Sequence, residues 1–112
     1  DLIASQGYGL EVPLSIVWIE SSGNPDARGR AGDTGLMQVV SRDGNQNPVF
    51  STRPTTNELL DPITNAYWGC SILAENIKRT GSVIQGLDRY NGKAGYGEFV
   101  LWLANAIKTS LT

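Results

Sequence analysis

The segment that follows Asp61 contains the strongest folding signal in the sequence. Asp61 and Pro62 provide a cap and a first turn for a helix, and Gly81 ends it. Between them, apolar residues recur every three or four positions, as on the buried side of an α-helix. They are Ile63, Ala66, Tyr67, Cys70, Leu73, Ala74 and Ile77. We therefore expect a long helix with this stripe facing the core.

Five shorter helices are expected elsewhere in the chain. They cover residues 2–6, 13 to 21 or 22, 34–40, 82 to about 89, and about 98 to 110. The expected core face of the last helix is Phe99, Leu103, Ala106 and Ile107. Residues 24–33 and 41–60 are rich in turn-forming residues and are expected to be loops. Since no alternating pattern of useful length predicts a strand, we expect a single all-α domain over residues 1–112.

Composition excludes several classes of function. The chain has 112 residues, a net charge of −2, no histidine and one cysteine, Cys70. A Ser-His-Asp triad, a His-ligated metal site and an internal disulfide are therefore impossible, and we expect no metal and no cofactor. Lys and Arg are scattered, which argues against nucleic acid as a partner. No stretch is apolar and long enough for a membrane span, and no basic-then-apolar targeting segment is expected within these residues, which says nothing about the destination of the protein.

Glu20 is the residue with the clearest chemical potential. It closes the apolar run from Val12 to Ile19 and is followed within a few positions by Gly23 and Pro25. An acid at the end of an apolar helix, where glycine breaks the chain, suits a carboxyl group half-buried at a cleft. Burial raises the pKa of a carboxyl group, which is what a general acid needs near neutral pH.

Four blocks of the sequence resemble the catalytic domain of the lytic transglycosylases, members of the lysozyme-like superfamily. The blocks are Glu20-Ser21 with Asn24-Pro25 and Ala27; Gly32 with Gly35-Leu36-Met37-Gln38; Leu60-Asp61-Pro62 with Asn65, Gly69 and Leu73; and Tyr90-Asn91-Gly92. They follow the family's order with roughly its spacing and span almost the whole chain. The resemblance implies an all-α, lysozyme-like transglycosylase domain with a substrate cleft.

The resemblance also implies a reaction. Glu20 would be the sole acid/base for the β-1,4 bond between N-acetylmuramic acid and N-acetylglucosamine in peptidoglycan. Its carboxyl group would protonate the glycosidic oxygen and then take the proton of the muramoyl C6 hydroxyl, which closes onto C1 and leaves a 1,6-anhydro end. Gln38, Tyr90 and Asn91 would contact the sugar, although Asn91 with Gly92 also fits a helix cap.

Two positions depart from the family pattern and leave alternatives open. Gly29 stands where many relatives carry a serine, and Asp33 stands where they carry alanine. Asp33 is a candidate second carboxylate, as in a goose-type muramidase that uses water, but a local turn bond is the favoured interpretation. An inactive glycan-binding module on the same fold is the other alternative.

Further expectations concern packing and setting. Asn65 and Gly69 are expected to be architectural, and Met37 to lie in the core. Trp18 and Trp102 lie at helical spacing in apolar runs and are also expected in the core, with Trp68 the most exposed of the three. The expected partner is the peptidoglycan glycan strand, met in the cell envelope, as periplasm or cell wall, or by a phage particle. We expect a monomeric domain, either alone or within a larger protein.

Overall fold

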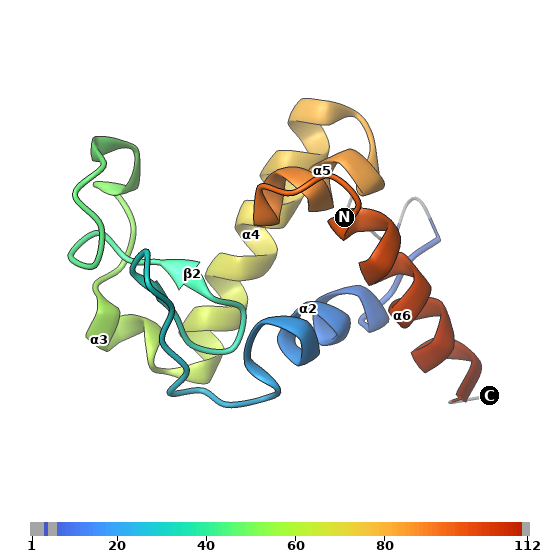
Figure 1. Cartoon of the computed structure of the whole chain (residues 1–112), viewed down its shortest axis with the longest axis horizontal. Helices are drawn as coiled ribbons and strands as arrows, with labels where there is room; N and C mark the ends of the chain where they lie inside the picture. Colours follow the sequence, from blue (N-terminus) through green and yellow to red (C-terminus); the bar gives the residue numbers. More distant parts are fainter. Residues whose placement is uncertain (1–3, 5–6, 111–112) are drawn as a thin grey trace. The chain divides into compact units, whose positions relative to one another are not determined.

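The computed structural model of the protein describes residue 4 and residues 7–110, and these are mainly helical (Figure 1). The elements are α2 (Glu11–Ser21), β1 (Asp33–Thr34), β2 (Val39–Val40), the 3-10 helix η1 (Pro48–Phe50), α3 (Thr56–Leu59), α4 (Pro62–Thr80), α5 (Val83–Asn91) and α6 (Tyr96–Ser110). The predicted all-α class is confirmed. The helix predicted over residues 2–6 lies outside the described residues, apart from Ala4, which is helical. Within the described part of the chain, no helix could cross a membrane.

The chain divides into two compact units. One unit is Val17–Gly69, and the other, here called the terminal unit, combines Asp1–Ile16 with Cys70–Thr112. The divisions fall inside α2 and inside α4. The assignment of residues 1–112 to a single domain stays a prediction.

Residues 34–40 form a hairpin, and the helix predicted there is wrong. Asp33 pairs with Val40 and Thr34 with Val39, and the four residues between them form the turn. Gly35 and Gln38 both have positive φ, at 78° and 52°, a backbone conformation that a right-handed helix cannot contain. The Gln38 N–H donates to the Gly35 carbonyl at 3.1 Å, which closes the turn.

The hairpin turn is held by one side chain of α4. Asn65 is fully buried, and its Oδ1 accepts the Met37 N–H at 2.8 Å. Its Nδ2 donates to the carbonyls of Thr34 at 2.7 Å and Leu59 at 2.9 Å. Buried backbone polar groups need partners inside the protein, and Asn65 bonds one in the turn, one in β1 and one at the end of α3. Its predicted architectural role is therefore well founded.

Two glycines allow the turn to approach α4 this closely. A Cβ at Gly35 would overlap the Asn65 amide. A Cβ at Gly69 would lie 2.8 Å from Cβ of Met37 and 2.9 Å from its Cε. The side chain of Met37 therefore packs into a notch on α4, and it is fully buried, as predicted.

The segment 41–60 contains short elements that the sequence analysis treated as loop. Thr55 caps α3 in a reciprocal arrangement: its Oγ1 accepts the Glu58 N–H, and the Glu58 carboxylate accepts the Thr55 N–H. Asp43 accepts hydrogen bonds from both the N–H and the hydroxyl of Thr56. Elements of three and four residues are too short to show a helical period, so the pattern could not reveal them.

Helix α4 begins and ends as predicted, but half of its buried face is different. Asp61 accepts the N–H and the hydroxyl of Thr64, and Gly81 follows the last turn with φ of 73°. The residues buried along α4 are spaced four apart: Asn65, Gly69, Leu73 and Ile77. Ile63 and Tyr67, predicted to face the core, are 80% and 68% exposed. The predicted stripe is wrong in the N-terminal half of α4, because the hairpin packs there against the polar Asn65 and the small Gly69.

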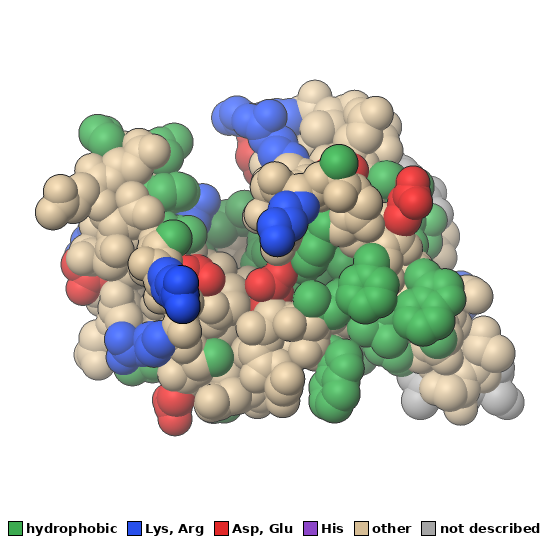
Figure 2. Space-filling model, in the orientation of Figure 1, with side chains coloured by type: hydrophobic (Ala, Val, Ile, Leu, Met, Phe, Trp, Pro, Cys, Tyr) green, Lys and Arg blue, Asp and Glu red, His purple; other side chains and the backbone are tan. Residues whose placement is uncertain are grey.

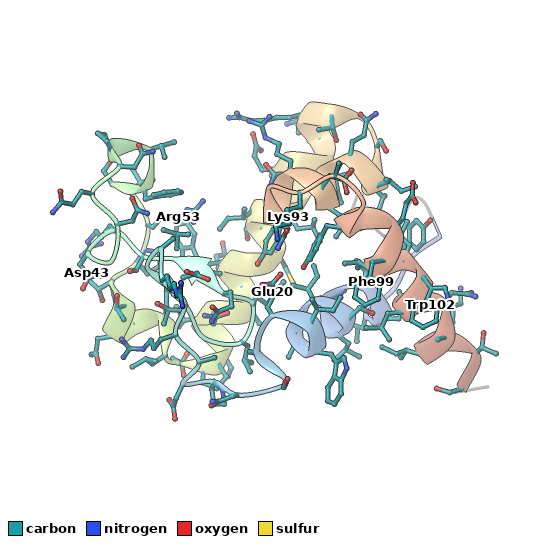
Figure 3. The ribbon with its side chains drawn as sticks, in the orientation of Figure 1. Glu20, Asp43, Arg53, Lys93, Phe99 and Trp102 are labelled. Atoms are coloured by element: carbon teal, nitrogen blue, oxygen red, sulfur yellow. The ribbon has the colours of Figure 1, made fainter. Side chains whose placement is uncertain are left out.

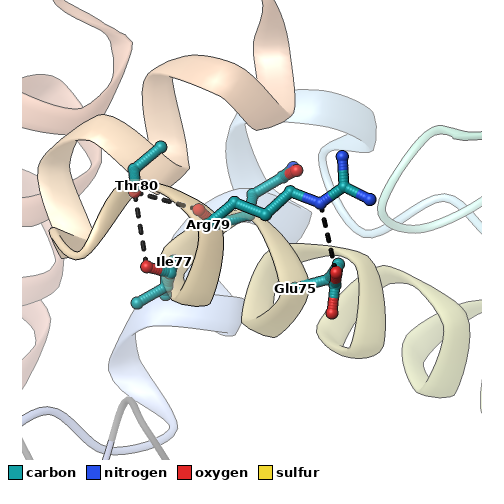
Figure 4. Close-up of polar contacts among 5 residues, drawn as sticks. Glu75, Ile77, Arg79 and Thr80 are labelled. Atoms are coloured by element: carbon teal, nitrogen blue, oxygen red, sulfur yellow. Dashed lines mark hydrogen bonds and ion pairs between the residues drawn. The ribbon is translucent and has the colours of Figure 1, made fainter.

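The C-terminal end of α4 is closed by local polar contacts (Figure 4). The hydroxyl of Thr80 lies within hydrogen-bond distance of the carbonyls of Asn76 and Ile77, in the last turn of the helix. Arg79 forms an exposed ion pair with Glu75 at 3.1 Å. An exposed pair of this kind contributes little to stability.

In the terminal unit, α5 and α6 pack through glycine. Ser82 caps α5 by accepting the Gln85 N–H, as predicted. A Cβ at Gly97 on α6 would overlap the carbonyl oxygen of Ile84 on α5, so only glycine permits this approach. The buried face of α6 is Tyr96, Gly97, Val100 and Ala104, not the face that was predicted.

The aromatic residues on α6 are on the surface. Phe99 and Trp102 stack at 6.0 Å with an angle of 11° between their planes, and they contribute to the hydrophobic patch over α6 in Figure 2. Trp102 is 66% exposed and Trp18 on α2 is 63% exposed, whereas Trp68 is half-buried. The core predictions for Trp18 and Trp102, and the ranking of Trp68, are wrong. Helical spacing identifies a face, but the neighbouring elements decide whether that face is covered.

The Asn65 contact can be tested by truncation. Asn65→Ala would remove three hydrogen bonds to buried backbone groups, and each such group left without a partner costs about 1–3 kcal/mol. We expect the free energy of unfolding to fall by about 3–5 kcal/mol, measured by urea denaturation. Asn57→Ala, on the exposed side of α3, is the matched control and should change stability by less than about 0.5 kcal/mol. Equal stabilities for the two variants would contradict this account.

The Asp61 cap predicts a dependence of stability on pH. The hydrogen bonds from Thr64 lower the pKa of Asp61 below its usual value. A carboxyl group with a lowered folded-state pKa stabilises the protein above its unfolded-state pKa, and this contribution is lost as the pH falls through the folded-state pKa. The thermal midpoint of the parent should therefore fall more steeply between roughly pH 5 and pH 2 than that of Asp61→Asn. Asp26→Asn, which removes an exposed carboxylate in a neighbouring loop, should keep the steep parental slope.

Candidate active site

Glu20 lies at an abrupt end of α2. It is the second-to-last residue of the helix, as Figure 3 shows, and its side chain is half-buried. Ser22 and Gly23 follow with positive φ, at 53° and 79°, so the helix cannot continue. The Ser22 N–H donates to the Trp18 carbonyl at 3.1 Å, and the Asn24 N–H to the Ser21 carbonyl at 3.0 Å. The position of the Glu20 backbone is therefore set by a regular helix on one side and a tight turn on the other.

The amide of Gln38 is oriented by the protein itself. Its Nε2 donates to the carbonyls of Ala27 at 3.2 Å and Gly35 at 3.0 Å, so both N–H groups have backbone partners. No described residue donates a hydrogen bond to Oε1. An amide held in this way can accept a hydrogen bond from a ligand but has no N–H to spare. A sugar contact by Gln38 would therefore use the carbonyl oxygen.

Asp33 is half-buried at the start of β1, and its side chain turns back along the chain. Oδ1 accepts the Ala31 N–H at 3.1 Å, which is the local turn bond that the sequence analysis favoured. The main chain of the same loop is closed by the Gly29 N–H, which donates to the Asp33 carbonyl at 2.8 Å. The carboxylate is thus held in one place by its own loop.

Tyr90 and Asn91 form the last two positions of α5. Gly92 takes the left-handed cap conformation with φ of 87°, and its N–H donates to the Asp88 carbonyl at 2.7 Å. Tyr90 is half-buried and Asn91 is exposed. Of the predicted site residues, Glu20, Asp33 and Gln38 belong to the Val17–Gly69 unit, whereas Tyr90 and Asn91 belong to the terminal unit.

Acidic residues and one cysteine are the candidate metal and thiol groups in the described part of the chain. There, no three residues of the types His, Cys, Asp and Glu lie close enough together to hold a metal ion. Cys70 is half-buried, and this burial raises the pKa of its thiol. A raised pKa reduces the fraction of thiolate at neutral pH, which is the reactive form.

Sequence reasoning missed how Asn65 supports the site. Asn65 and Gly69 interrupt the apolar stripe of α4, and the pattern was completed with Ile63 and Tyr67 instead. The available signal was the register: Asn65 and Gly69 are spaced four residues apart and continue to Leu73 and Ile77. A polar residue in line with a buried row indicates a backbone segment that needs hydrogen-bond partners.

Comparison with known proteins identifies the family. Residues 4–109 match the transglycosylase SLT domain model. The chain is also 35% identical over 91 residues to a transglycosylase of Enterobacteria phage PRD1, covering 80% of this chain and 32% of that protein. The chain therefore spans about a third of the length of this relative. No solved structure matches the present chain with statistical significance. The protein belongs to the transglycosylase SLT domain family.

Proposed function

We propose that this domain cleaves the β-1,4 bond between N-acetylmuramic acid and N-acetylglucosamine in peptidoglycan, with Glu20 as the single acid/base and 1,6-anhydromuramoyl ends as products. The observation that carries the proposal is the half-buried Glu20 at the end of α2. Family membership supports the same reaction class. The substrate is the glycan strand of the cell envelope, reached from the periplasm, the cell wall or a phage particle.

The chemistry requires one group to donate and then accept a proton. The Glu20 carboxyl group protonates the glycosidic oxygen as the bond to C1 breaks. The resulting carboxylate removes the proton of the muramoyl C6 hydroxyl, whose oxygen forms the new bond to C1. Glu20 therefore donates one proton and takes one back, and no water is consumed. Gln38 assists by accepting a hydrogen bond from the sugar through Oε1.

We assign Tyr90 and Asn91 secondary parts in this proposal. The phenol of Tyr90 is a neutral donor that can hold a carboxyl group or a sugar oxygen without adding charge. Asn91 is the last residue of α5 and precedes the left-handed Gly92, which caps the helix.

Hydrolysis is the second candidate, and Asp33 is the reason to consider it. Its carboxylate is half-buried, and no described residue donates a hydrogen bond to Oδ2. An inverting hydrolase needs a second carboxylate roughly 6.5–9.5 Å from the acid, with room for a water molecule. In that mechanism Asp33 would be the base, and the product would be an ordinary reducing end.

The products of digestion distinguish the two candidates. We expect mass spectrometry of digested, purified peptidoglycan to show muramoyl ends lighter by one water than reducing ends, because the C6 oxygen replaces water as the nucleophile. Borohydride reduction before the measurement serves as the control, since anhydro ends are not reduced. A digest that contains reducing ends alone would exclude the transglycosylase reaction.

Replacement of the acid tests the role of Glu20. Glu20→Gln keeps the size of the side chain but removes the proton that is transferred. The turnover rate should fall by about a hundredfold or more, the scale of general acid catalysis, with little change in the thermal midpoint. Glu98→Gln makes the same exchange at an exposed position of α6 and should retain parental turnover. Parental activity in Glu20→Gln would remove Glu20 from the mechanism.

A further inference from the structure

Gly29 and Asp33 share one space in the loop that follows α2. A Cβ added at Gly29 would overlap all three terminal atoms of the Asp33 side chain, Cγ, Oδ1 and Oδ2. Because this overlap involves the whole carboxylate, position 29 can carry a side chain only if that carboxylate moves.

Glycine at position 29 is explained by the lack of room for a Cβ and not by the backbone conformation. Gly29 is not among the described residues with positive φ, so other residues could adopt its backbone conformation. This differs from neighbouring Gly32, whose φ of 85° favours glycine whatever the surroundings. Gly29 is therefore a glycine because of Asp33.

The backbone at Asp33 is held on both sides, and its carboxylate accepts one hydrogen bond. The Gly29 N–H donates to the Asp33 carbonyl, and the Ala31 N–H donates to Oδ1. On either side of these bonds, Asp33 pairs with Val40 in the hairpin, and Arg28 forms an isolated bridge with Thr34. Oδ2 is left as an acceptor to which no described residue donates a hydrogen bond, on a half-buried side chain.

We propose that the Asp33 carboxylate occupies the side-chain site of position 29, and that its Oδ2 accepts a hydrogen bond from a hydroxyl or amide N–H of the glycan. The ligand part of this proposal rests on the proposed function, whereas the coupling of the two positions does not. A carboxylate accepts hydrogen bonds and has none to donate, and its charge strengthens each bond that it accepts. Asp33 is thus a positioning residue for substrate, distinct from the acid Glu20.

The coupling is tested by a double-mutant cycle on stability. The variants are Gly29→Ala, Asp33→Ala and the double variant, compared by thermal midpoint. Gly29→Ala should lower the midpoint by several degrees in the parent, because the new methyl group displaces the carboxylate. In the Asp33→Ala background, the same change should cost nothing or raise the midpoint. Equal effects of Gly29→Ala in both backgrounds would overturn the coupling.

The ligand contact is tested by steady-state kinetics on peptidoglycan with Asp33→Asn. The variant keeps the shape of the side chain and can keep the bond from Ala31, but it loses the charge. We expect KM to rise roughly three- to tenfold, the scale of one hydrogen bond, with kcat close to the parental value. Asp26→Asn, exposed in the same loop region, is the control and should keep both constants.

Each other outcome has a definite meaning. Unchanged KM in Asp33→Asn would reduce Asp33 to a turn residue and overturn the ligand contact. Loss of kcat by a hundredfold or more with unchanged KM would also overturn it and would make Asp33 the base of a hydrolase. Absence of glycan cleavage by the parent would refute the proposed function and the ligand contact with it, while the stability cycle would still decide the coupling.

Discussion

The side-chain amide of Asn65 is the contact on which the hairpin and its neighbours depend. It bonds one N–H and one carbonyl of the hairpin, which is distant in sequence, and the carbonyl of Leu59 at the end of α3, all away from water. An apolar residue of similar size could fill the space but would leave three polar groups without partners. The Gly35–Gln38 turn takes its shape from this amide and from the notch at Gly69 that receives Met37. The orientation of Gln38 follows from that shape.

The hydrogen bonds inside this unit determine what it can offer to a ligand. Gln38 directs both N–H groups to backbone carbonyls, which leaves Oε1 as its outward group. Asp33 uses Oδ1 for its own turn and leaves Oδ2. Both remaining atoms are acceptors, and Glu20 adds a carboxyl group at the end of α2. Such a set of groups suits a ligand rich in hydroxyl donors, as a glycan is.

The sequence predicted where helices occur more accurately than which face each one buries. On α4, an apolar stripe was extended to Ile63 and Tyr67, although packing against the hairpin requires Asn65 and Gly69 on the buried side. On α6, Phe99 and Trp102 were expected to lie in the core. Close contact of Gly97 with Ile84 instead places the face that contains Gly97 on the inside. In both cases a large apolar residue expected in the core is exposed and a glycine is buried on the same helix, because close backbone approach decided the packing.

The sequence by itself determined the features that depend on neighbours along the chain. These include the Asp61 and Ser82 caps, the glycine stops, the ends of α4 and the exclusion of His-based chemistry. Its four blocks also indicated the family to which the chain belongs. The tertiary structure decided that residues 34–40 form a hairpin, that Asn65 binds it and that Gln38 presents an oxygen. Those outcomes depend on hydrogen bonds and close approaches between residues far apart in the chain, which local propensity and periodicity do not encode.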